Sequence, residues 1–183
     1  MTLTRCSLAL FVALSVTACE ITPKQPDVHD FGLPVGLGSS NNVSVPNIDI
    51  DAPKWIWDTR IRYRLLYKSP TKVNFYMLDR WIATPPELFK QQLVAQGKSL
   101  RYPLSIKFLD FEQQFDSVKQ AKVFIRVSVT AFSNTNKPLA TREFQWQRLT
   151  QTPDANGAVQ GFAVLVQKAV NDIDSWLANL PIP

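Results

Sequence analysis

The sequence is poor in cysteine and histidine, two side chains that enzymes often use for covalent or acid–base chemistry. Its 183 residues include two cysteines, Cys6 and Cys19, and one histidine, His29. No thiol follows Cys19, which excludes a disulfide, a cysteine nucleophile and a thiolate metal site from the rest of the chain. A Ser-His-Asp site would have to use His29, yet no G-x-S-x-G motif supplies its serine. We therefore expect no enzyme and no metal site, and we interpret His29 as a surface or turn residue.

Long hydrophobic runs and nucleotide-binding loops are also missing. The apolar run Leu8–Val16, interrupted by Ser15, falls well short of the about 20 residues that a membrane-spanning helix needs. No G-x-x-x-x-G-K-[ST] loop is present to bind ATP, so we expect neither a permease nor a motor. The formal net charge of +5 is spread along the sequence, whereas a nucleic-acid site needs clustered Lys and Arg. We expect no nucleic-acid partner, and anionic lipid headgroups remain a candidate partner.

Residues 1–18 have the order of a bacterial export signal. Arg5 and the amino terminus are positive, the apolar run follows, and Val16-Thr17-Ala18-Cys19 ends the segment. This order resembles the lipobox of bacterial lipoproteins. The resemblance implies that residues 1–18 are removed and that Cys19 carries an N-acyl diacylglycerol, the one group bound to the protein. An ordinary secretory signal or a transmembrane anchor is the alternative.

The lipobox also implies a location. Two or more acyl chains hold a protein stably at a bilayer, so the mature protein is expected on a phospholipid membrane surface. Glu20 stands where lipoproteins retained at the inner membrane usually carry Asp. The resemblance therefore indicates the periplasmic face of the outer membrane of a Gram-negative bacterium.

Composition divides the rest of the chain into a linker and one domain. Residues 19–42 are rich in Pro, Gly, Ser and Asn, which predicts an acylated N-terminus and flexible linker with one short edge strand at His29–Leu33. Residues 43–183 are long enough for a single domain with its own core. Period-two spacing predicts a strand over Val43–Ile50, an edge-like stretch at Lys54–Trp57, and a hairpin over Arg60–Trp81.

The second half of the domain is predicted to be strand-rich. Leu104, Ile106 and Phe108 alternate in one phase, and Leu109, Phe111 and Phe115 alternate in the other, which indicates a bulge or a strand covered on both faces. Two further strands are predicted over 121–131 and 140–149, on either side of a turn at 134–138.

Two helices complete the predicted fold. Thr84 as N-cap, Pro85 at the first helical position and Glu87 in a capping box predict a helix that ends at Gly97. Apolar residues at helical spacing predict a second, amphipathic helix over 157–179 whose stripe faces the core, and Trp81 and Trp176 are interpreted as core residues. Strands followed by a helix, twice over, predict a single α+β domain whose mainly antiparallel sheet is covered on one face by two helices.

Three stretches of the sequence match a known protein family in spacing and residue class. They are Arg60–Arg64 through Asn74–Tyr76 to Trp81 and Pro85–Leu88; Leu109–Phe115 followed by Ala121–Ile125; and Gly161 leading into the helix that ends at Trp176-Leu177. Together with the lipobox they resemble the ABC-type transport auxiliary lipoproteins, which include the outer-membrane lipoprotein of the paraquat-inducible system. The opening Tyr-x-Leu-Gly of that family appears here only as His29-Asp30-Phe31-Gly32.

The resemblance implies an accessory or docking component. Its partners would be an MCE-domain protein, which forms a hydrophobic passage for lipids between the inner and outer membranes, and the associated permease and ATPase. A homo-oligomer around that passage is also expected. The alternative is a structural or assembly lipoprotein, such as a pilotin for an envelope secretion channel, and neighbouring genes for an MCE protein, a permease and an ATPase would distinguish the two.

Five side chains are candidates for contact with a partner or with lipid. Arg60, Arg62 and Arg64 share one strand face and could bind lipid phosphates or an acidic partner, or form an ordinary solvated face. Trp55 and Trp57 lie in polar, proline-bounded sequence, where they could dock a partner, lie at a membrane interface, or pack on the sheet.

Overall fold

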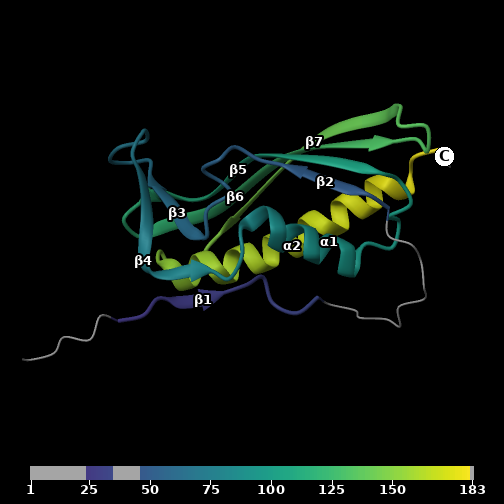
Figure 1. The fold of residues 1–183 in the computed structure, drawn as a ribbon. Helices are drawn as coiled ribbons and strands as arrows, with labels where there is room; N and C mark the ends of the chain where they lie inside the picture. The colour runs from purple at the N-terminus through teal and green to yellow at the C-terminus, as the bar shows by residue number, and fades with distance from the viewer. Residues whose placement is uncertain (1–23, 35–45, 182–183) are drawn as a thin grey trace, which may run out of the picture.

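One mixed sheet and two helices make up the fold. The computed structural model describes residues 24–34 and 46–181. The strands are β1 (Asp27–His29), β2 (Ile48–Asp51), β3 (Arg60–Leu65), β4 (Val73–Trp81), β5 (Leu104–Ser117), β6 (Gln120–Phe132) and β7 (Pro138–Leu149); the helices are α1 (Pro85–Gln96) and α2 (Ala155–Ala178). The strand order is β1-β4-β3-β5-β6-β7, and β2 also pairs with β5 (Figure 1).

The pairing combines antiparallel and parallel strands. The long pairs β5–β6 and β6–β7 and the hairpin β3–β4 are antiparallel. The pairs β1–β4, β2–β5 and β3–β5 are parallel. Strands β3 and β5 run in the same direction because β4 and α1 form a crossover between them. The single α+β domain is thus confirmed, and the sheet is mixed because the strands of its N-terminal half pair in parallel.

Both helices lie on the same face of the sheet (Figure 1). Helix α2 packs on β6 and β7, and α1 packs on α2 and β2. The start of α1 is as predicted, since the Glu87 carboxylate accepts hydrogen bonds from the Thr84 backbone N–H (2.9 Å) and hydroxyl (2.6 Å). Helix α2 begins two residues earlier than predicted, because Asp154 caps it by accepting a hydrogen bond from the Gly157 N–H at 2.8 Å.

The predicted change of phase in β5 is confirmed. Leu104, Ile106 and Phe108 are buried against the helices, and after a register shift between Phe108 and Asp110 the buried positions become Phe111 and Phe115. The extra residue of a bulge reverses the alternation, so that the residues beyond it point to the face opposite to the one they would otherwise occupy. Odd-numbered residues of β5 therefore face the helices beyond Asp110, and even-numbered residues face away from them.

The N-terminal segment belongs to the fold. The expected edge strand lies two residues earlier, at Asp27–His29, and pairs with β4. Beyond it Phe31 is only 2% exposed and meets Trp81 edge to face at 5.0 Å. The folded domain thus includes part of the stretch interpreted as linker, because one aromatic side chain there enters the core.

Two other expectations for this half need correction. Lys54–Trp57 forms a turn and not an edge-like strand, because the Ile56 N–H donates to the Pro53 carbonyl at 2.8 Å. Strand β2 covers Ile48–Asp51, whereas residues 43–45 of the predicted strand lie outside the described residues. Trp81 is in the core as predicted, whereas Trp176 is only partly buried and packs against the core.

Replacing Phe31 tests whether the N-terminal segment stabilises the domain. Phe31→Ala removes a side chain that is 2% exposed, and we expect it to lower the free energy of unfolding by about 3–5 kcal/mol in urea titrations. Leu33→Ala is the control, since Leu33 is 84% exposed and should change stability by less than about 0.5 kcal/mol. If Phe31→Ala changed the free energy of unfolding as little as Leu33→Ala does, Phe31 would contribute nothing to the core.

Candidate functional site

The candidate arginines lie on the face of the sheet that the helices leave uncovered. Ile61 of β3 is fully buried on the helix side, so Arg60, Arg62 and Arg64 point to the other face, as their alternation predicted. We call this surface the open face. Strand β5 contributes Glu112 to it, because β3 and β5 pair in parallel with Tyr63 opposite Gln113. Arg62 directly precedes Tyr63, and Glu112 directly precedes Gln113. Since the two strands are parallel, Arg62 and Glu112 lie side by side.

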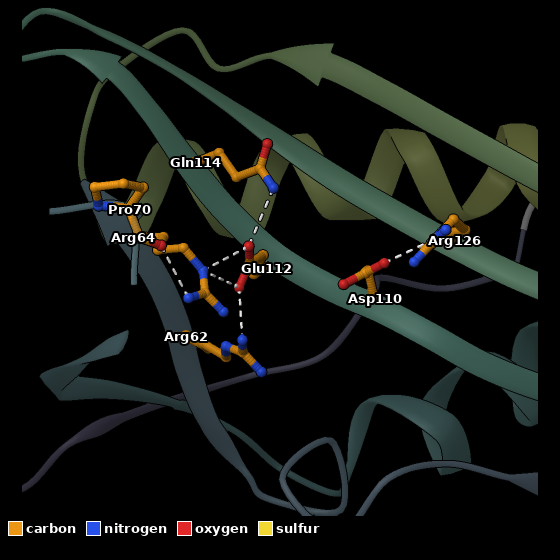
Figure 2. A network of polar contacts seen from close by, with 7 residues as sticks. All are labelled: Arg62, Arg64, Pro70, Asp110, Glu112, Gln114 and Arg126. Atoms are coloured by element: carbon orange, nitrogen blue, oxygen red, sulfur yellow. Dashed lines mark hydrogen bonds and ion pairs between the residues drawn. The ribbon is translucent and has the colours of Figure 1, made fainter. Parts of the chain in front are cut away.

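Glu112 is the centre of a buried ion-pair network (Figure 2). Its side chain is 5% exposed, and its carboxylate lies 2.9 Å from Arg62 Nη2 and 3.0 Å from Arg64 Nε. Gln114 Nε2 also donates to Glu112 Oε1 at 3.0 Å. The Arg62 side chain is only 10% exposed, and burial lowers the pKa of its guanidinium while the charge of Glu112 opposes that shift. The expectation of an ordinary solvated face is therefore wrong for Arg62, which is desolvated and needs its carboxylate partner.

Trp55 covers Arg62 from the outside. Its ring lies 4.0 Å from the centre of the Arg62 guanidinium, a cation–π contact, and the side chain is still 43% exposed. The turn that carries Trp55 spans a gap in the sheet, because β2 pairs with β5 at Leu104–Lys107 and β3 pairs with it only from Gln113. Trp57 is 39% exposed, and its indole N–H donates to the Ala52 carbonyl at 3.0 Å. The two tryptophans thus hold fixed positions on the protein while part of each ring faces solvent.

Arg60 and Arg126 on the open face are paired as well. Arg60 Nε binds Asp58 Oδ2 at 2.9 Å and its guanidinium lies 3.9 Å from the Phe75 ring. The hydrogen bond between the two side chains raises the pKa of Arg60 and lowers the pKa of Asp58. Arg126 binds Asp110 at 2.8 Å (Figure 2). A phosphate would have to compete with these carboxylates, so the surface is suited to a protein partner more than to an isolated anion.

Sequence reasoning missed the carboxylates that organise this surface. Glu112 was unremarkable in the sequence, and its role follows from the β5 bulge combined with the parallel β3–β5 pairing. Asp58 could have been noticed two residues before Arg60 at the end of a turn. Cys19, the predicted lipidation site, lies outside the described residues.

Other kinds of site find little support in the described part of the chain. Residues 24–34 and 46–181 contain no group of three or more His, Cys, Asp or Glu side chains placed to hold a metal ion. None of the helices formed by these residues is both long and apolar enough to cross a bilayer.

Comparisons with known proteins identify the fold. No protein-family model and no curated protein matches the chain. A solved structure from Xanthomonas campestris, described as a member of the DUF330 family, matches with a TM-score of 0.65 at 17% identity over 85% of this chain and 93% of its own. A second, uncharacterized protein matches with a TM-score of 0.65 at 12% identity over 84% of this chain and 99% of its own. At these identities the likeness establishes the α+β fold alone.

Replacing Glu112 tests the buried network. Glu112→Gln leaves Arg62 buried without a carboxylate, and we expect a loss of about 3 kcal/mol or more in the free energy of unfolding. Glu143→Gln is the control, since that side chain is 55% exposed and lies 3.6 Å from Arg126, a surface pair whose loss should cost less than about 1 kcal/mol. Urea denaturation of both variants measures the difference. A Glu112→Gln variant as stable as Glu143→Gln would contradict the assigned role.

Proposed function

We propose that this protein is a lipid-anchored accessory component of an MCE-type ABC system for lipid transport between the inner and outer membranes. Cys19 holds it at the periplasmic face of the outer membrane, and the open face docks on the MCE-domain protein that works with a permease and an ATPase. The protein itself performs no catalysis and binds no cofactor besides its acyl chains. Support for the anchor comes from the lipobox, and support for the transport system comes from the resemblance of the three stretches named above.

The Trp55–Arg62–Glu112 stack is the observation that carries the docking role. Tryptophan and arginine are the residues that most often dominate the energy of protein interfaces. Here the ring of Trp55 is held by the guanidinium beneath it, and that guanidinium is held by a buried carboxylate. Binding would therefore cost little further side-chain entropy, which favours affinity.

An extraction experiment tests the proposed system. The full-length acylated protein is extracted from its native envelope in mild detergent, and mass spectrometry identifies the proteins and lipids that accompany it. We expect an MCE-domain protein with its permease and ATPase. The Cys19→Ala variant is the control, because it cannot receive the lipid anchor and should not be recovered with these proteins at the outer membrane. Recovery of a secretion or cell-wall assembly in place of the MCE protein would support the pilotin-like alternative.

Substitution of the tryptophans tests the docking surface. We expect Trp55→Ala to weaken binding to the partner about thirtyfold, which corresponds to about 2 kcal/mol for a hot-spot residue, and Trp57→Ala to weaken it in the same direction. Tyr67→Ala is the matched control, since Tyr67 is 45% exposed and Trp55 is 43% exposed. Binding is measured with the purified partner, and thermal melting shows that each variant is folded. Unchanged affinity in both tryptophan variants would remove the two residues from the site.

A further inference from the structure

A bulge in β4 presents two neighbouring apolar side chains to solvent. Arg62 pairs with Phe75 and Arg60 pairs with Arg80, so the segment Tyr76–Asp79 lies opposite a single residue of β3. We call this segment the β4 bulge. Met77 is 83% exposed and Leu78 is 43% exposed. In a regular strand two successive side chains point to opposite faces, whereas the bulge turns both of these outward.

The base of the β4 bulge is fixed on both sides. The Tyr76 hydroxyl donates to Gln113 Oε1 at 2.6 Å, and its ring lies 4.7 Å from the ring of Tyr63. Burial raises the pKa of Tyr76, so the hydroxyl keeps the proton that it donates. At the other side Asp79 Oδ1 lies 2.9 Å from His29 Nε2. The exposure of Met77 and Leu78 is therefore held by the surrounding structure.

The β4 bulge lies beside the strand that leads to the acylated cysteine. Strand β1 pairs with the end of the bulge, with Asp27 opposite Asp79 and Val28 opposite Arg80, and Figure 1 shows β1 running alongside the final part of β4. Lys24, the first described residue, follows Cys19 by five residues in the sequence. Five residues of fully extended chain are at most about 18 Å long. Acylation of Cys19 therefore keeps the start of β1, and the bulge beside it, near the bilayer surface.

We propose that the β4 bulge is a membrane-contact site, in which Met77 and Leu78 enter the headgroup and outer acyl region of the bilayer that anchors Cys19. This inference rests on the proposed function, because it takes the acyl anchor as given. A bilayer is the partner that we assign to this site, because the short segment between Cys19 and Lys24 keeps the β4 bulge close to the membrane. Exposed charges of both signs occur in and around β1 and the end of β4: Lys24 and Arg80 are positive, and Asp27 and Asp30 are negative. Contact therefore depends on burial of apolar surface more than on anionic lipid.

A fluorescence experiment on the full-length acylated protein tests the inference. Cys6 leaves with the signal and the Cys19 sulfur carries the diacylglycerol, so Leu78→Cys introduces the one free thiol, which is labelled with an environment-sensitive dye. In vesicles of phosphatidylethanolamine and phosphatidylglycerol we expect the dye emission to shift to shorter wavelength and to be quenched by nitroxide-labelled lipid. Met77→Cys should give the same result. Leu139→Cys is the matched control, since Leu139 is 44% exposed and Leu78 is 43% exposed, and its dye should behave as in water.

The possible outcomes separate the membrane contact from the anchor. If the protein floats with the vesicles but the dyes at 77 and 78 behave like the dye at 139, the membrane contact is wrong and the anchor stands. If the acylated protein fails to float, the anchor and the membrane contact both fall. In vesicles of phosphatidylcholine alone we expect the same shift. Its loss there would indicate electrostatic adsorption to anionic lipid and would overturn the apolar insertion proposed here.

Discussion

The change of phase in β5 is the constraint on which the core and the open face both depend. Before the bulge, Phe108 faces the helices; after it, Phe111 does so, and Glu112 turns to the open face. Without the bulge, a continued alternation would direct Glu112 into the core and Phe111 toward solvent. One extra residue in one strand therefore keeps a carboxylate out of the apolar interior and delivers it to Arg62 and Arg64.

Phe111, placed inward by that bulge, joins segments that are far apart in the sequence. Its ring stacks on Phe162 of α2 at 4.1 Å, and Phe162 also meets Trp81 of β4 at 5.8 Å. Trp81 in turn contacts Phe31, which follows β1. Helix α2 comes close enough for these contacts because Gly161 has no side chain: a Cβ there would lie 3.0 Å from Val123. The N-terminal segment, the hairpin, the central strand and the helix thus share one aromatic cluster.

Features with a local chemical signal could be predicted from the sequence, and features that depend on pairing between distant segments could not. The start of α1 follows from Thr84, Pro85 and Glu87, which lie within one turn, and the β5 bulge follows from two phases of apolar residues. The parallel pairs leave no such signal, because nothing in β3 specifies which strand lies beside it. The arginines of the candidate site were therefore found, and their partner Glu112 was not.

The position of β1 bears on how a lipid-anchored protein of this fold could present its open face. Acyl chains hold a protein at a membrane, but a flexible tether alone leaves the domain free to turn. In the proposed arrangement the tether from Cys19 would enter the fold through β1. In the structure, His29 holds Asp79 at the base of the β4 bulge, and Phe31 joins the aromatic cluster. That cluster contacts β5, which also carries Glu112 beneath Arg62 and Trp55. In the proposed arrangement, a membrane contact at Met77 and Leu78 would thus be connected through rigid packing to the docking surface, and it would fix the direction in which Trp55 meets its partner.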